Sequence, residues 1–124
     1  MLADADLVAF AASTDLDAAE AFYGGVLGLE LVDSTPFAKV FDAHGTQLRV
    51  TRVDAVAGAA YTVLGWRVDD LDAAVAALRS RGVEPRRYEG MEQDEKGIAR
   101  GPGPEIAWFK DPAGNILAVL ESES

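Results

Sequence analysis

The chain of 124 residues is long enough for one domain, and 49% of it is hydrophobic, which suffices for a buried core at this length. Its 21 acidic and 11 basic residues give a net charge of −10, which argues against nucleic-acid binding through a basic face. There is no cysteine, which excludes disulfides, thiolate nucleophiles and sulfur-ligated metals. No apolar run approaches the ~20 residues of a membrane span. The acidic start is unlike a signal peptide, so we expect a cytoplasmic protein without membrane contact.

The first half of the chain predicts the order strand, helix, strand, strand, strand. The predicted strands are residues 7–12, 29–33, 37–42 and 46–53. Ser13-Thr14 offers a helix N-cap, and Asp15 and Asp17 follow in the first turn, where carboxylates favour the positive end of the helix dipole. Gly28 ends this helix, and His44-Gly45 predicts a tight turn between the last two strands.

The second half repeats this order after a linker of small residues at 54–60. Asp69 is the expected cap of a helix over residues 70–80, which Gly82 ends. The predicted strands are residues 61–68, 83–88, 105–109 and 115–121. Residues 89–103 are polar and glycine-rich without periodicity, so they form either a lid over a binding site or a solvated charged loop.

The two halves are also similar in sequence. Residues 15–21 (DLDAAEA) return as residues 70–76 (DLDAAVA), with six of the seven positions identical. Residues 41–50 and 111–119 align when Gly45 is placed on Gly114. Such a repeat indicates one supersecondary unit used twice.

Residues 15–23 (DLDAAEAFY) with 27–29 (LGL), and residues 108–115 (WFKDPAGN), resemble the vicinal oxygen chelate superfamily, which includes glyoxalases, extradiol dioxygenases and bleomycin-resistance proteins. The resemblance covers nearly the whole chain. It implies an α+β fold of two tandem βαβββ modules, which form a curled mixed-sheet cup with the helices outside. We expect a single domain over 1–124, with modules at about 6–53 and 61–121 and the linker 54–60 between them.

Period-2 alternation then divides the strand residues between the helix side and the cup side. Leu48 and Val50 are expected on the helix side, and Gln47 and Arg49 in the cup. The expected ligand-binding residues are Phe10, Gln47, Arg49, Tyr61, Val63, Met91, Trp108 and Ala118. They would line an apolar hollow with a few polar groups, which is the usual composition of a small-molecule site.

The resemblance also implies where a divalent metal would be held in the enzymes of this superfamily. The matching positions here are Val8, Arg49, Val63 and Ala118. None of these side chains offers a lone pair to a metal, and arginine adds a positive charge. We therefore expect no metal and no cofactor.

These expectations favour a metal-independent protein that binds a small organic molecule, as in sequestration of a drug or metabolite. The alternative is an enzyme with a non-standard site, such as a glyoxalase-like lyase, an isomerase or a dioxygenase. It would either work without a metal, using Tyr61, Arg49 or a carboxylate of the loop 89–103, or hold a metal with displaced ligands. A third alternative is a structural module whose cup is filled by its own side chains. A homodimer is expected because a half-open cup leaves strand edges uncovered.

Several residues have two open interpretations. Arg49 either binds an anionic ligand group or forms an ion pair with Asp42 on the neighbouring strand. Trp108 and Phe109 alternate, so one of them faces the cup. His44 is expected to be a polar turn residue, and its alternative role is that of a base or metal ligand.

Overall fold

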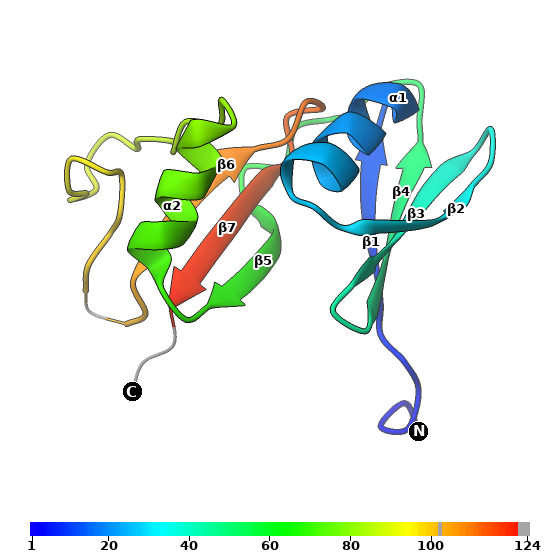
Figure 1. Cartoon of the computed structure of the whole chain (residues 1–124), viewed down its shortest axis with the longest axis horizontal. Helices are drawn as coiled ribbons and strands as arrows, with labels where there is room; N and C mark the ends of the chain where they lie inside the picture. Colours follow the sequence, from blue (N-terminus) through cyan, green and yellow to red (C-terminus); the bar gives the residue numbers. More distant parts are fainter. Residues whose placement is uncertain (102, 122–124) are drawn as a thin grey trace. The chain divides into compact units, whose positions relative to one another are not determined.

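The computed structural model describes residues 1–101 and 103–121. The chain divides into two compact units, Met1–Gly58 with Pro112–Gly114, and Ala59–Asp111 with Asn115–Ser124. Each unit combines a small mixed sheet with a helix that contacts it (Figure 1). The predicted α+β class of repeated modules is therefore confirmed, and neither sheet closes into a barrel. No described helix has the length and apolar character that crossing a membrane requires.

The first unit contains a four-stranded sheet in the order β1-β4-β3-β2. Its strands are β1 (Val8–Ser13), β2 (Glu30–Ser34), β3 (Ala38–Ala43) and β4 (Thr46–Arg52). The pairing of β1 with β4 is parallel, and the other two pairings are antiparallel. The strand bounds agree with the predicted ones to within one residue at nearly every end.

The helix of the first unit begins and continues differently from the prediction. Asp15, rather than Ser13-Thr14, is the N-cap: its Oδ1 accepts hydrogen bonds from the backbone N–H groups of Asp17 and Ala18, both at 3.0 Å. A short α1 (Leu16–Ala19) then passes into a π-helix, η1 (Glu20–Val26). Gly28, with a φ of 76°, follows its end, as predicted.

Packing of this helix identifies the buried face of the first sheet. The ring of Tyr23 in η1 lies 5.9 Å from the ring of Phe41 in β3. Phe41 stands opposite Leu48, which is buried, and Val50 follows two residues later on the same face. The predicted alternation in β4 is therefore confirmed, and Arg49 lies on the opposite face of the sheet.

The turn between β3 and β4 also matches its prediction. His44 and Gly45 both have positive φ, 52° and 91°, as a two-residue type I′ hairpin turn requires. The Asp42 carboxylate accepts the backbone N–H of Gly45 at 3.1 Å, which supports the turn. His44 is exposed in this turn.

The second unit contains a three-stranded sheet in the order β5-β7-β6. Its elements are β5 (Thr62–Val68), α2 (Leu71–Ser80), β6 (Ile106–Lys110) and β7 (Ile116–Glu121). The helix cap is Asp70, one residue later than the predicted Asp69, and its Oδ1 accepts the N–H of Ala73 at 3.0 Å. Gly82, with a φ of 84°, ends the helix as predicted.

The predicted strand at 83–88 is wrong, because this stretch forms no ladder. One backbone bond joins it to β6, from the N–H of Arg86 to the carbonyl of Trp108 at 2.6 Å. The Gln93 side chain takes the other bonds: it accepts the N–H of Tyr88 at 2.8 Å and donates to the carbonyls of Arg86 and Gly97 at 2.9 and 2.8 Å. The Gln93 amide thus forms the backbone hydrogen bonds that a neighbouring strand would otherwise form.

Strand β5 contains a bulge near its start. Thr62 lies opposite Ile116, whereas Leu64 lies opposite Leu117, so Val63 has no partner of its own on β7. An extra residue of this kind reverses the alternation of every side chain that precedes it.

The bulge corrects one equivalence between the repeated modules. Val8 lies opposite Gln47, two residues after Gly45, and Thr62 lies opposite Ile116, two residues after Gly114. The counterpart of Val8 in the second unit is therefore Thr62, and not Val63, which the resemblance places with Val8 among the four metal positions.

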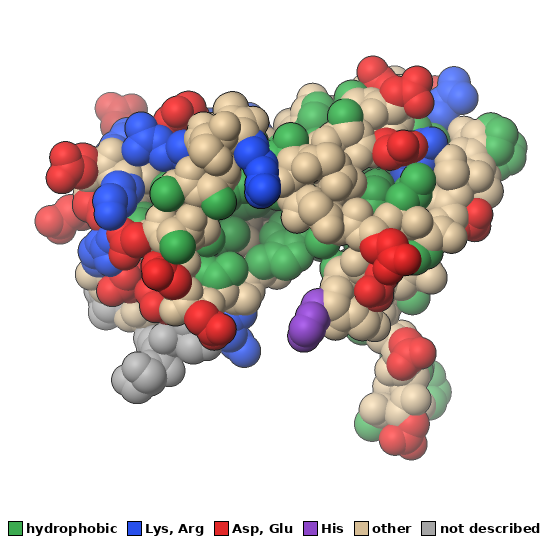
Figure 2. All heavy atoms as spheres, viewed as in Figure 1, with side chains coloured by type: hydrophobic (Ala, Val, Ile, Leu, Met, Phe, Trp, Pro, Cys, Tyr) green, Lys and Arg blue, Asp and Glu red, His purple; other side chains and the backbone are tan. Residues whose placement is uncertain are grey.

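The segment 89–105, of which all residues but 102 are described, is held to the rest of the second unit by residues 94–100. Ile98 is fully buried, and Ala99 forms an isolated bridge with Ile106. The Arg100 guanidinium forms ion pairs with Asp72, Asp94 and Glu105 at 2.8, 2.7 and 2.5 Å. Basic and acidic side chains accordingly lie close together around α2 and the following segment (Figure 2).

These ion pairs affect the carboxylates. Hydrogen bonds from Lys96 and then Arg100 hold the pKa of Asp72 below its ordinary value. Burial alone would raise the pKa of Asp94, but hydrogen bonds from Arg100 and from the N–H groups of Ile98 and Lys96 lower it. Both carboxylates are thus stabilised in the charged form.

Candidate functional site

The open face of the first sheet, on the side opposite α1 and η1, brings several predicted residues together. Its side chains come from alternate positions of β1, β4 and β3: Val8, Phe10, Gln47, Arg49, Val40 and Asp42. Three of the predicted ligand-binding residues, Phe10, Gln47 and Arg49, are therefore neighbours on this face. We call it the open face below.

Arg49 stands at the centre of the open face. Its two cross-strand neighbours are Phe10 on β1 and Val40 on β3. Directly opposed residues have Cβ atoms about 4.5–5.5 Å apart, close enough for the aliphatic stem of an arginine to contact them. Arg49 is half-buried, and within residues 1–101 and 103–121 its guanidinium has no ion-pair or hydrogen-bond partner.

The alternative ion pair between Arg49 and Asp42 is absent from the described residues. Asp42 lies opposite Gln47, and its Oδ1 accepts the backbone N–H of Gly45 at 3.1 Å. The turn thus uses the carboxylate that would neutralise Arg49. The ion-pair interpretation of Arg49 is therefore wrong. Binding of an anionic ligand group by Arg49 stays a prediction.

Phe10 gives the open face an apolar surface beside this cation. Its side chain is 62% exposed and Val8 is 38% exposed, while Val40 next to Arg49 is buried. An exposed aromatic ring, an apolar floor and an unpaired guanidinium together suit a flat apolar compound that carries an oxygen acceptor.

One end of the open face opens into a hollow of about 380 Å³. Val8, Asp42 and Gln47 contribute to its lining, together with Asp6, which precedes β1, and Glu30 of β2, which lies opposite Asp42. These carboxylates disfavour negative groups at this end. An anionic group is therefore better placed at Arg49, with a neutral or apolar part of the ligand toward the hollow.

The second unit places Trp108 and Ala118 opposite each other on one face of its sheet. The indole Nε1 of Trp108 donates to the Thr62 hydroxyl at 3.2 Å, and the Tyr88 ring meets the indole edge-on with ring centres 5.4 Å apart. Phe109 lies on the other face and is buried. Trp108 is thus the residue that shares a face with Ala118.

The other predicted residues of the second unit lie outside this pairing. Tyr61 precedes β5 and is 70% exposed, Val63 is the bulge residue, and Met91 is 44% exposed in the segment 89–105. Their part in a binding site stays a prediction.

Three residues near Trp108, namely Thr62, Tyr88 and Arg86, were not among the predicted site residues. Thr62 was missed because the bulge has no recognisable sequence signal, and counting along the strand selected Val63 without Thr62. Tyr88 was assigned to a strand end. Arg86, whose guanidinium carbon lies 5.7 Å from the centre of the Tyr88 ring, was placed in the same predicted strand. The stretch VEPRRY that ends at Tyr88 contains no pattern that marks it as a site residue.

The sequence matches the model of the Glyoxalase/Bleomycin resistance protein/Dioxygenase superfamily over residues 7–119. The chain belongs to this superfamily. No curated protein matches it.

Solved structures of the superfamily resemble the chain over nearly its whole length. A lactoylglutathione lyase from Agrobacterium tumefaciens is 27% identical, with 95% of this chain and 93% of that chain covered and a TM-score of 0.72. An antibiotic binding protein from Streptomyces sp. CB03234 is 22% identical, with 99% of each chain covered and a TM-score of 0.72. A fosfomycin resistance protein from Listeria monocytogenes is 16% identical, with 97% and 91% covered and a TM-score of 0.73. The last two similarities concern the fold alone.

The metal that the superfamily implies does not fit the residues of this member. The expected positions hold Val8, Arg49, Val63 and Ala118, and the register replaces Val63 by Thr62, whose neutral hydroxyl is a poor ligand. Within the described part of the chain, no group of three or more His, Asp or Glu side chains is arranged to hold a metal ion.

Proposed function

We propose that the protein binds a small organic molecule on the open face without a metal ion, and holds the molecule rather than transforms it. The observation that carries the proposal is the unpartnered Arg49 guanidinium beside the exposed Phe10, at a position where the superfamily resemblance implies a metal ligand. The favoured ligand has an aromatic body and a carboxylate, phenolate or carbonyl oxygen.

The free energies expected from contacts with Arg49 and Phe10 limit the affinity for such a ligand. A hydrogen bond to a charged group contributes about 1.5–3 kcal/mol. An aromatic pair adds about 0.5–1.5 kcal/mol beyond area burial. The sum, about 2–4.5 kcal/mol, corresponds to dissociation constants of about 0.5–30 mM. Tighter binding of a larger natural ligand therefore requires contacts beyond Arg49 and Phe10.

The negative charge of the whole chain does not contradict an anionic ligand. Exposed charges are screened within about 8 Å at physiological salt, whereas Arg49 acts at contact distance. The net charge of −10 should slow encounter with an anion, and Arg49 should select it after encounter.

An enzyme is the second candidate, and the 27% identity to a lactoylglutathione lyase favours it. Such an enzyme would be a lyase, isomerase or dioxygenase with a non-standard site. Incubation of each bound compound with the protein, followed by mass spectrometry, separates the two functions. Release of a changed product would replace sequestration by catalysis.

The binding proposal is tested with benzoate, benzamide and cyclohexylmethanol, titrated into ¹⁵N-labelled protein. Benzoate should bind best, because it has both the ring and the charged acceptor. Arg49→Gln should weaken benzoate binding by about tenfold or more, and Phe10→Ala by a smaller factor. Arg67→Gln removes the same charge from an exposed position of β5 and is the control. Equal benzoate affinity in the wild-type protein and Arg49→Gln would refute the proposal.

We also propose a homodimer in the cytoplasm. β1 is the edge of the first sheet, and its unpaired backbone groups and the exposed Leu7 that precedes it offer a surface that a second copy would cover. Sedimentation at micromolar concentration should give twice the chain mass, with an interface of order 1,200 Å² or more. A monomer under these conditions would contradict the dimer, and cell fractionation would test the location.

A further inference from the structure

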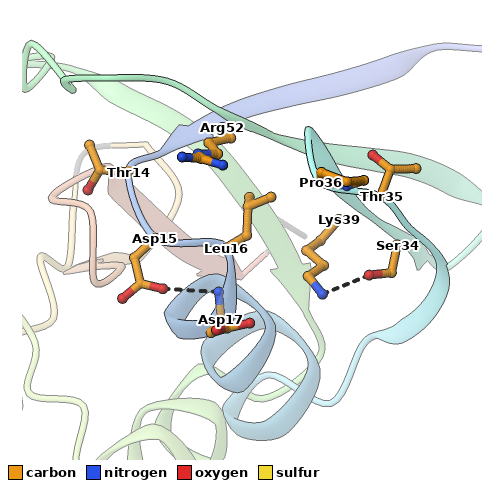
Figure 3. Close-up of a pocket in the computed structure, with 9 residues that line it drawn as sticks. All are labelled: Thr14, Asp15, Leu16, Asp17, Ser34, Thr35, Pro36, Lys39 and Arg52. Carbon is orange, nitrogen blue, oxygen red and sulfur yellow. Dashed lines mark hydrogen bonds between the residues drawn. The ribbon is translucent and has the colours of Figure 1, made fainter.

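A second hollow lies on the helix side of the first unit, away from the open face. It measures about 670 Å³, between the start of α1, the turn from β2 to β3 and the end of β4 (Figure 3). Its basic residues are on the buried face of the sheet: Arg52 follows Val50 by two positions, and Lys39 lies opposite Val50. The volume is within the range of about 300–1,000 Å³ found for small-molecule sites.

The two basic side chains of this hollow differ in whether they have hydrogen-bond or ion-pair partners. Lys39 is bound on both sides: its Nζ lies 2.8 Å from Glu20 Oε1 and donates to the Ser34 hydroxyl at 2.7 Å, and its side chain is only 13% exposed. The Arg52 guanidinium has no hydrogen-bond or ion-pair partner among the described residues. Arg52 is therefore the free donor of the hollow.

The two acidic side chains of the hollow, Asp15 and Asp17, also differ in their hydrogen-bond partners. Asp15 Oδ1 accepts the backbone N–H groups of Asp17 and Ala18, so part of this carboxylate serves the helix cap. The Asp17 carboxylate is exposed and has no partner within residues 1–101 and 103–121. The hollow thus presents one free cation and one free anion.

Apolar side chains lie between these charges. Leu16 is half-buried and stands between the start of the helix and Arg52, and Pro36 lines the hollow from the turn between β2 and β3 (Figure 3). A bound molecule that reached both charges would therefore also cover an apolar surface.

We propose that this hollow binds a small zwitterion of the α-amino acid or short-peptide class. The carboxylate would accept hydrogen bonds from Arg52, the ammonium group would lie at Asp17, and an apolar side chain would cover Leu16. Simple anions are disfavoured by Asp17 and simple cations by Arg52, so a ligand with both charges fits best.

The test uses L-leucine with two analogues, 4-methylpentanoate, which lacks the amine, and 3-methylbutylamine, which lacks the carboxylate. Each is titrated into ¹⁵N-labelled protein. Leucine should shift the signals of residues around Leu16 and Arg52. Each analogue should bind at least about tenfold more weakly than leucine. Arg52→Gln and Asp17→Asn should each weaken leucine binding by about tenfold, while Arg67→Gln should not change it.

Circular dichroism of each variant controls for folding. If folded Arg52→Gln binds leucine as the wild-type protein does, or if 4-methylpentanoate binds equally well, the zwitterion site is refuted. The result is independent of benzoate binding at the open face, because Arg49 and Arg52 lie on opposite faces of β4.

Discussion

Replacing Gly97 by alanine tests whether the segment 89–105 is fixed to the second unit or moves as a lid. A Cβ added to Gly97 would lie 2.7 Å from Cβ of Pro85, closer than real Cβ atoms approach. Backbone hydrogen bonds hold both Gly97 and the residue next to Pro85 in place. Gly97 donates its N–H to Asp94 and accepts from Gln93, while the N–H of Arg86, next to Pro85, is bound to Trp108.

Gly90→Ala is a matched control. Gly90 and Gly97 have nearly the same φ, 81° and 85°, but a Cβ on Gly90 has no atom within 4 Å. Both variants carry the left-handed backbone cost of about 1–2 kcal/mol and the opposing gain of about 0.4–1 kcal/mol from a less flexible unfolded chain. The control should therefore lose about 1 kcal/mol. Overpacking against Pro85 should cost Gly97→Ala a further 1–3 kcal/mol or so.

Urea unfolding monitored by tryptophan fluorescence measures this difference. Both tryptophans of the chain, Trp66 and Trp108, belong to the second unit, so the signal reports on the unit that contains both glycines. A difference of 1–3 kcal/mol corresponds to midpoints about 1 M apart for a typical urea dependence. Equal losses within about 0.5 kcal/mol would refute the fixed contact and restore the lid interpretation.

Other consequences of the structure can be measured separately. Ile98→Ala should destabilise the second unit by about 2–5 kcal/mol in the same assay, because Ile98 is fully buried; a loss below about 1 kcal/mol would contradict its place in the core. The lowered pKa values of Asp72 and Asp94 mean that their stabilising contribution is present above the ordinary value of 3.8 and is lost as the pH falls through the lowered values. Arg100→Gln should raise both pKa values in a carboxyl ¹³C NMR titration, and unchanged values would refute the ion-pair network. Zinc, nickel, manganese and iron(II) should leave the melting temperature unchanged, whereas a metal present at 100 times its dissociation constant would add about 2.7 kcal/mol; such a shift would overturn the proposed metal independence.

The fold could be predicted wherever a local rule applies without competition. The alternation of Leu48, Arg49 and Val50 fixed the two faces of β4, and His44-Gly45 identified the hairpin, because period-2 patterning and turn chemistry act over a few residues. The repeat further indicated that the second unit would follow the same plan. Strand alternation and the repeat together were sufficient to place Phe10, Gln47 and Arg49 on one face.

Predictions failed where distant groups compete with local ones. Residues 83–88 were expected to form a strand because the order of elements repeats, but Pro85 cannot donate to a ladder and the Gln93 side chain binds the backbone of Arg86 and Tyr88. The segment 89–105 is polar on average, yet it includes the fully buried Ile98. The bulge at Val63 and the hollow around Arg52 depend on which chains lie side by side, which no local pattern determines.

The bulge in β5 affects how this chain should be compared with others. β5 is an edge strand, where one additional residue can be accommodated while the pairing continues on either side. A sequence alignment does not detect such an insertion when the flanking sequence stays similar. It then assigns the function of one side chain to its neighbour. Functional positions in this strand are better assigned by the residue that faces them across the ladder than by counting along the chain.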